Sequence, residues 1–302
     1  MSHILSSITE GVRNVWMAKF LIGLMFVFKL ISSFVLVFPL YLMFSSSFGA
    51  NVKASNLLSG FDPSLLLDFV YHWRQTLSIY FFMFILVGGI ITAAYLFLSG
   101  GFWGILGDQV KKKRITIPAE LPENTLEKFF GYCGKYFGGM LKISLLMIPL
   151  YLFAFLMVLT FNVIFGSITG KVNIWEVTSW RMIVRIGITL FLFLWFKMTG
   201  DYMRISLVEN QGDPFWTVIR RAFRFVLTNT SATLSLYYIL GLIWLGTFLI
   251  YLGSHILIQG MFPAGIFILI AFIAQQIYAV FISFYRLVYY SSQLSLYDRI
   301  EQ

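Results

Sequence analysis

Charged residues are scarce in this sequence, and their scarcity excludes most classes of soluble protein. Only 12% of the 302 residues are charged, whereas 59% are hydrophobic. A soluble globular domain carries about a quarter charged residues, so the composition excludes an ordinary soluble enzyme and a disordered chain. We therefore expect a protein built for a lipid environment.

Cysteine and histidine are also rare. The single cysteine, Cys133, excludes an intramolecular disulfide and any metal site built from several cysteines. None of the three histidines lies in the middle of an apolar run, which argues against haem ligation within a membrane. The sequence contains no nucleotide-binding loop, zinc-protease motif or serine-hydrolase motif. We therefore expect no cofactor, no metal and no enzymatic activity.

Six long apolar runs dominate the sequence. They cover residues 20–44, 77–99, 138–165, 182–200, 231–252 and 262–287. Each is about as long as the roughly 20 residues that a membrane-spanning helix needs, and a helix satisfies its own backbone polar groups in lipid. The sequence thus predicts an all-α integral membrane protein with six transmembrane helices, forming a single membrane domain over residues 1–302.

Lys and Arg are distributed unevenly between the two sides of these predicted spans. Six spans place both termini on one side, and most of the 22 Lys and Arg residues fall on that side. Because basic loops stay in the cytoplasm, we predict that both termini are cytoplasmic. The net charge of +9 then indicates contact with anionic lipid headgroups rather than nucleic acid, for which no recognition motif is present.

A repeated unit underlies the six runs. Amphipathic stretches precede the first, third and fifth runs, and the clearest has apolar residues at helical spacing: Phe215, Val218, Ile219, Ala222, Phe223 and Val226. The other three runs continue into Leu106-Gly107-Asp108, Leu207-Val208-Glu209 and Leu296-Tyr297-Asp298. We predict three repeated hairpins, each preceded by an interfacial amphipathic helix, in pseudo-repeats 1–110, 119–210 and 213–302. The alternative is that basic amphipathic flanks are general to polytopic proteins.

Small residues and prolines inside the helical segments predict how the helices pack. Gly100 and Gly104, and likewise Gly134 and Gly138, are spaced to let two helices approach closely. Pro39 and Pro149 lie inside predicted spans, where each removes a backbone hydrogen bond. We interpret these prolines as packing devices, with a gating hinge as the alternative.

Lys29 is the least expected residue of the first span. It lies about ten residues into the run, roughly 15 Å from its inner end at 1.5 Å per residue, close to the middle of the bilayer. A charge there costs about 2.5–3.5 kcal/mol, so its side chain needs partners. We predict an intramembrane polar or ligand site formed by Lys29, Ser32, Ser33, Gln275 and Gln276. The alternatives are a structural lysine satisfied by protein groups and a lysine that reaches the interface.

Basic residues also cluster on the predicted cytoplasmic side. The cluster comprises Lys111, Lys112, Lys113, Arg114, Arg220, Arg221 and Arg224. Each such residue near an anionic leaflet is worth about 1 kcal/mol of attraction. We predict contact with lipid headgroups or a partner protein, with simple control of topology as the alternative reading.

The polar segment Glu209-Asn210-Gln211-Gly212-Asp213, followed by an arginine-bearing amphipathic helix and a further span, resembles a known group. It is similar to bacterial six-span inner-membrane proteins, the YciC-like proteins and the membrane region of some glycerophosphodiester phosphodiesterases. The resemblance is sharpest over residues 200–240, and the chain lacks the catalytic domain of the phosphodiesterases. It implies the six-span fold and a bacterial inner membrane, but no activity.

Two functions are compatible with these features. The first is a non-enzymatic membrane protein that acts as a scaffold, as an accessory subunit of a protein complex, or as a lipid-handling factor at the inner leaflet. The alternative is a secondary transporter or lipid translocator for an anionic or amphiphilic substrate, which the repeats, the prolines and Lys29 favour.

Overall fold

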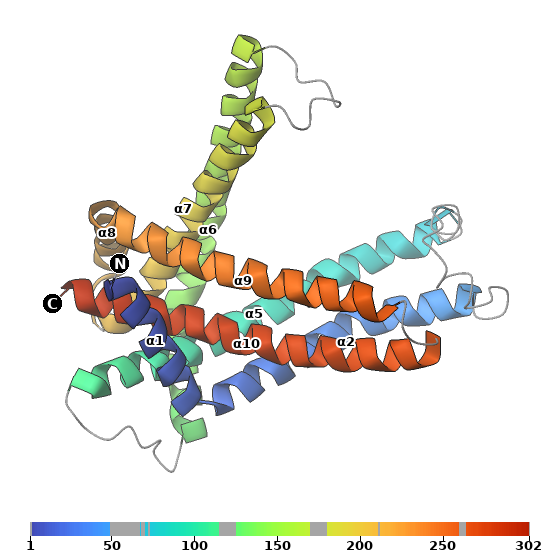
Figure 1. Ribbon diagram of the computed structural model, residues 1–302, viewed down its shortest axis with the longest axis horizontal. Coiled ribbons are helices and arrows are strands. Elements are labelled where there is room, and N and C mark those ends of the chain that lie inside the picture. The colour runs from blue at the N-terminus through green and yellow to red at the C-terminus, as the bar shows by residue number, and fades with distance from the viewer. Residues whose placement is uncertain are drawn as a thin grey trace. The chain divides into compact units, whose positions relative to one another are not determined.

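The computed structural model describes residues 2–48, 67, 70–71, 73–114, 125–169, 180–210, 212–259 and 264–301, and these residues form helices and the turns between them, with no strand. The helices are α1 (Ser2–Met17), α2 (Phe20–Phe48), α5 (Arg74–Arg114), α6 (Thr125–Thr169), α7 (Trp180–Glu209), α8 (Phe215–Thr228), α9 (Thr230–Gln259) and α10 (Ala264–Glu301) (Figure 1). The predicted all-α class is confirmed.

Five of these helices are long and apolar enough to cross a membrane, so the chain is a multi-pass membrane protein. They are α2, α5, α6, α9 and α10. The remaining long helix, α7, is not among the five. A sixth span along α7 and the threefold hairpin repeat therefore stay predictions.

The amphipathic stretches differ in how they join the long helices. A turn at Ala18 and Lys19 separates α1 from α2, and Asn229 separates α8 from α9. The Asn229 side chain donates a hydrogen bond to the Phe225 carbonyl, 3.2 Å away, and so occupies the end of α8. In contrast, α6 continues without a break from its amphipathic start into its apolar part. The stretch before the third apolar run is therefore not a separate helix.

The chain forms two compact units, and each consists of segments that are distant in sequence. The first unit comprises residues 1–14, 96–241 and 289–302, and the second comprises residues 15–95 and 242–288. Helices α5, α9 and α10 contribute residues to both units. The single domain and the three predicted pseudo-repeats remain a prediction about the organisation of the sequence.

The first unit has a closely packed aromatic core. Trp103 of α5 stacks on Tyr290 of α10, with ring centroids 4.4 Å apart. The Phe225 ring of α8 lies 5.0 Å from the Tyr202 ring of α7 and 4.6 Å from the Tyr297 ring of α10. These rings bring four helices together, and their burial contributes to the hydrophobic stabilisation of this unit.

Glycines of α5 allow α6 to pack closely against it within the first unit. A Cβ atom added at Gly104 would lie 2.5 Å from the Tyr132 ring, and one added at Gly101 would meet the side chains of Phe129 and Cys133. At Gly100 the nearest atoms would be 3.2 Å away. The predicted close approach at Gly100 and Gly104 is confirmed. The same prediction for Gly134 and Gly138 is wrong, because nothing lies within 4 Å of either position.

Side chains of the second unit are mostly exposed although they are apolar. Ile90 of α5 and Leu269 of α10 are 62% and 60% exposed. A soluble protein does not present so much contiguous apolar surface, whereas lipid covers it at no cost. The exposure of this unit is therefore the expected one for helices that cross a bilayer.

Candidate functional site

Lys29 lies in a pocket of the second unit. The pocket has a volume of about 370 Å³ and is lined by Phe28, Lys29, Ser32 and Ser33 of α2 and by Ile91, Thr92 and Tyr95 of α5. Residues three and four positions apart share one face of a helix, so Lys29, Ser32 and Ser33 are brought to the same wall. The structure thus places three of the five predicted site residues together.

The hydrogen-bond partner of Lys29 is a serine that the sequence did not single out. The Lys29 Nζ donates to the Ser283 Oγ of α10, 3.1 Å away. The Ser283 hydroxyl donates in turn to the Ala279 carbonyl at 2.9 Å, so its oxygen is oriented to accept from the lysine. Gln275 and Gln276 do not line this pocket. Ser283 lies about two turns beyond Gln276, on the same helical face, which is how it could have been found.

A second cation lies beside this pocket. The Arg286 guanidinium of α10 is 4.8 Å from the centre of the Tyr95 ring, and Tyr95 is part of the pocket wall. A cation over an aromatic ring is stabilised by the negative face of the ring. Within the described part of the second unit no Asp or Glu is present, so no described carboxylate of this unit neutralises Lys29.

The chemistry of the Lys29 pocket is therefore one of hydrogen-bond donors and positive charge. Lys29 can donate three hydrogen bonds, and Ser32 and Ser33 each offer a hydroxyl, whereas the Thr92 hydroxyl already donates to the Gly88 carbonyl at 2.7 Å. The pocket walls contain no carboxylate, histidine or cysteine that could transfer a proton or attack a substrate. Such a lining suits the binding of an anion.

The predicted basic cluster is only partly a free cationic surface. Lys111 of α5 pairs with the Glu209 carboxylate of α7 at 3.1 Å, and Arg221 of α8 pairs with Asp213 at 2.9 Å. Arg220 and Arg224 of α8 are exposed. The side chains of Lys112, Lys113 and Arg114 lie outside the described residues. Two members of the cluster therefore already have protein partners, and half-exposed pairs of this kind contribute about 0–1 kcal/mol each to stability.

The apolar face of α8 packs inside the first unit, where α8 contacts α7. Val218, Ile219, Ala222 and Val226 are buried, as their spacing predicts, and Phe225 is buried as well. Phe215 and Phe223 are half-buried. Protein therefore covers most of the face that the sequence suggested for a lipid interface, whereas Trp216 and Leu227 remain 69% and 62% exposed.

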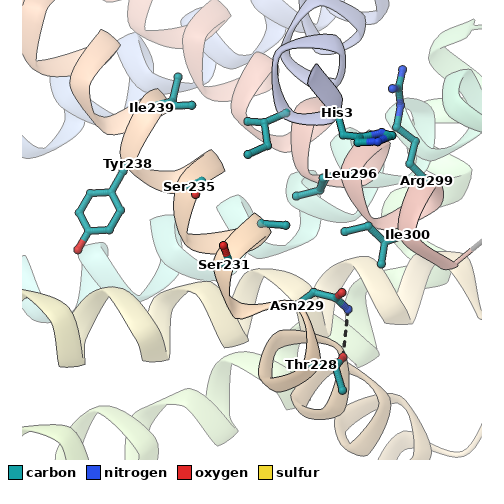
Figure 2. Close-up of a pocket in the computed structure, with 12 residues that line it drawn as sticks. His3, Thr228, Asn229, Ser231, Ser235, Tyr238, Ile239, Leu296, Arg299 and Ile300 are labelled. Atoms are coloured by element: carbon teal, nitrogen blue, oxygen red, sulfur yellow. Dashed lines mark hydrogen bonds between the residues drawn. The ribbon is translucent and has the colours of Figure 1, made fainter. Parts of the chain in front are cut away.

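A larger pocket lies in the first unit, and the sequence did not indicate it. Its volume is about 790 Å³, within the range of roughly 300–1,000 Å³ that is typical of ligand sites. It is formed by the start of α1, the junction of α8 and α9, and the end of α10 (Figure 2). It is lined by His3, Ile4, Thr228, Asn229, Ser231, Ala232, Ser235, Tyr238, Ile239, Leu296, Arg299 and Ile300.

Comparison with known proteins adds no function to these two pockets. No protein family, no curated protein and no solved structure matches this chain. The residues of the two pockets and their chemistry are therefore what indicates a function.

Proposed function

We propose that this chain is a non-enzymatic multi-pass membrane protein that handles lipids at the inner leaflet, and that it does so by binding an anionic amphiphile at Lys29. One observation carries the proposal. Lys29 lines a pocket among membrane-spanning helices, and the described residues of its unit contain no carboxylate to neutralise it.

The energetics of a charge in lipid favour such a ligand. An unneutralised lysine in the middle of a spanning helix costs about 2.5–3.5 kcal/mol, and its hydrogen bond to Ser283, at about 1.5–3 kcal/mol for a charged donor, offsets part of that cost without supplying an opposite charge. An anionic headgroup would provide the missing opposite charge, and its acyl chains would contact the apolar surface of the surrounding helices. The pocket and its surroundings thus combine a positive charge for the headgroup with an apolar surface for the acyl chains.

The proposed location follows from the distribution of Lys and Arg. Most of them lie on the side of the termini if six spans are present, which favours cytoplasmic termini in a bacterial inner membrane. The resemblance to the YciC-like proteins agrees with that location. In this orientation Lys29 is reached from the inner leaflet, where anionic lipids are common.

A secondary transporter or lipid translocator is the second candidate. The depth of Lys29 in α2 favours it, together with Pro39, which lies ten residues further along the same helix. Transporters that work by alternating access bind their substrate near the middle of the bilayer. A scaffold that docks a partner protein through Arg220 and Arg224 is a third possibility, because both side chains are exposed.

One purification distinguishes these candidates. The wild type, Lys29→Met and the exposed control Lys19→Met are purified in a mild detergent, and their retained lipids are identified by native mass spectrometry. We expect Lys29→Met to retain fewer anionic lipids per protein than the wild type and Lys19→Met while remaining folded. Equal retention in all three forms would contradict the proposal.

Two further measurements separate the remaining functions. A lipid-handling factor binds at Lys29 without moving lipid, whereas a translocator also transfers a fluorescent anionic lipid between the leaflets of a reconstituted vesicle. A scaffold is insensitive to Lys29→Met and loses its co-purifying protein when Arg220 and Arg224 are both replaced by Gln.

A further inference from the structure

The pocket of the first unit joins parts of the chain that are far apart in sequence. Ile4 comes from α1, Ser231 and Ser235 from α9, and Leu296 and Arg299 from α10. Figure 2 shows the serines on one side of the pocket and the α10 residues on the other. The pocket therefore forms only when α1, α9 and α10 pack together in the folded protein.

Small residues of α9 leave this space open. One face of the start of α9 is buried in protein through Thr233, Leu236, Tyr237 and Leu240. The opposite face carries Ser231, Ala232 and Ser235, which line the pocket. Small residues four positions apart usually allow a second helix to approach closely. None of the described helices fills this space, which is open to the surface at Ser231 and Tyr238, both of them exposed.

The lining changes from polar to apolar along α9. Thr228, Asn229 and Ser231 line the pocket at the start of α9. Ile239 lines it eight residues after Ser231, which is about 12 Å along the helix at 1.5 Å per residue. The apolar run of α9 begins at the same end and continues away from it. The pocket therefore becomes apolar in the direction in which α9 enters the membrane.

Two basic residues face the polar part of the pocket. His3 and Arg299 both line it and lie close to each other in Figure 2. The Arg299 guanidinium pairs with Glu10 at 2.7 Å, and the neighbouring Ser6 hydroxyl also accepts a hydrogen bond from it. A guanidinium has five donor hydrogens, so these two contacts leave donors for a third partner. No carboxylate is among the twelve lining residues.

We propose that this pocket binds a phospholipid. The phosphate accepts hydrogen bonds from Arg299, His3 and Ser231, and one acyl chain lies along Ile4, Ile239 and Leu296. Water alone would leave these apolar walls unfavourably hydrated, and a purely apolar ligand would leave the polar groups without partners. An amphiphile satisfies both parts of the pocket, in the orientation that lipids already have in the bilayer. This site is separate from Lys29.

Photo-crosslinking tests the proposal directly. The full-length protein is reconstituted into phosphatidylcholine nanodiscs that contain a phosphatidylglycerol with a diazirine on one acyl chain. After irradiation, we expect adducts on peptides that contain Ile239 or Leu296. Ala232→Phe fills the space beside Ser231 and Ser235, and it should reduce these adducts about tenfold, whereas Leu227→Phe, which adds a ring at an exposed position outside the pocket, should not.

The possible outcomes are separable. If Ala232→Phe does not fold, Ser235→Leu fills the same pocket from the next turn and gives the same comparison. Adducts that are equal in the filled variant and the control overturn the proposal. Absence of adducts on the apolar peptides, together with binding of inorganic phosphate to the purified protein, would assign the pocket to a soluble phosphate instead of a lipid. Lys29→Met should leave this labelling unchanged, so failure here is distinguishable from failure at Lys29.

Discussion

Glu10 of α1 and Arg299 of α10 form an ion pair in which the carboxylate oxygen and the guanidinium nitrogen are 2.7 Å apart. The Ser295 hydroxyl donates to the same carboxylate at 2.8 Å, and the Asn14 amide donates to the Ser291 hydroxyl at 3.2 Å. The partners recur every four residues on both helices and run in opposite directions. This polar seam fixes the start of the chain against its end within the first unit.

The seam predicts that the Glu10 and Arg299 pair stabilises the fold. Glu10→Ala should lower the free energy of unfolding by about 1–2 kcal/mol, because it leaves a partly buried guanidinium without its carboxylate. Thermal unfolding of the purified protein in detergent measures the effect. Arg220→Gln removes an exposed charge and serves as the control, and the reversed pair Glu10→Arg with Arg299→Glu should recover part of the loss. Equal stabilities for Glu10→Ala and the control would show that the seam is not stabilising.

Two buried tyrosines should respond differently to loss of their hydroxyl. The Tyr237 hydroxyl donates to the Asp201 carboxylate at 2.7 Å, whereas the Tyr202 hydroxyl is buried without a hydrogen-bond partner among the described residues. Burial, and secondly the charge of Asp201, raise the pKa of Tyr202, so it is neutral at pH 7. Tyr237→Phe should cost about 1–3 kcal/mol, and Tyr202→Phe should be neutral or stabilising. Urea or thermal unfolding compares the two variants, and a larger loss for Tyr202→Phe would refute this difference.

The glycines of α5 give a third prediction. Gly104→Ala places a Cβ atom 2.5 Å from the Tyr132 ring, so α5 and α6 must separate, at a cost of about 1–3 kcal/mol. Gly131→Ala adds the same methyl group to α6 where nothing lies within 4 Å. That control should be neutral or stabilising by up to about 1 kcal/mol, because alanine favours a helix over glycine. Equal stability of the two variants would show that α5 and α6 do not pack closely at Gly104.

The fourth prediction concerns topology. If most Lys and Arg residues lie in the cytoplasm, Arg220 should be on the cytoplasmic side of the membrane. In a Cys133→Ser background, a cysteine placed at exposed Arg220 should react with a membrane-impermeant maleimide only after the cells are opened. Labelling in intact cells would show that Arg220 lies outside the cytoplasm. That result would contradict the proposed location at the inner leaflet. Cys133 itself is buried and should react poorly in either case.

The regular part of this structure could be predicted because it depends on local sequence. Five of the six apolar runs fall within a helix, and the sixth lies in α10 from residue 264 onward, where its described part begins. The spacing of Val218, Ile219, Ala222 and Val226 identified the buried face of α8. The group formed by Lys29, Ser32 and Ser33 was also predictable, since it requires only one turn of helix. These features need no knowledge of which helices are neighbours.

The remaining features depend on contacts between distant segments. Ser283 is the partner of Lys29 because α10 lies beside α2 at that level, and nothing in the sequence specifies that level. The pocket at Ser231 and Arg299 requires α1, α9 and α10 to meet. The burial of Phe225 depends on Tyr202 and Tyr297, which come from two other helices. Hydropathy and spacing contain no information about these pairings.

A binding titration at Lys29 tests the central claim most directly. Nanodiscs of the wild type, Lys29→Met and Lys29→Arg are titrated with a fluorescent anionic lipid and with its zwitterionic counterpart. If Lys29 binds the headgroup through its charge, Lys29→Met should weaken anionic binding by about tenfold or more and leave zwitterionic binding unchanged, while Lys29→Arg should retain most of the affinity. The same affinity for the anionic lipid in all three proteins would contradict the claim.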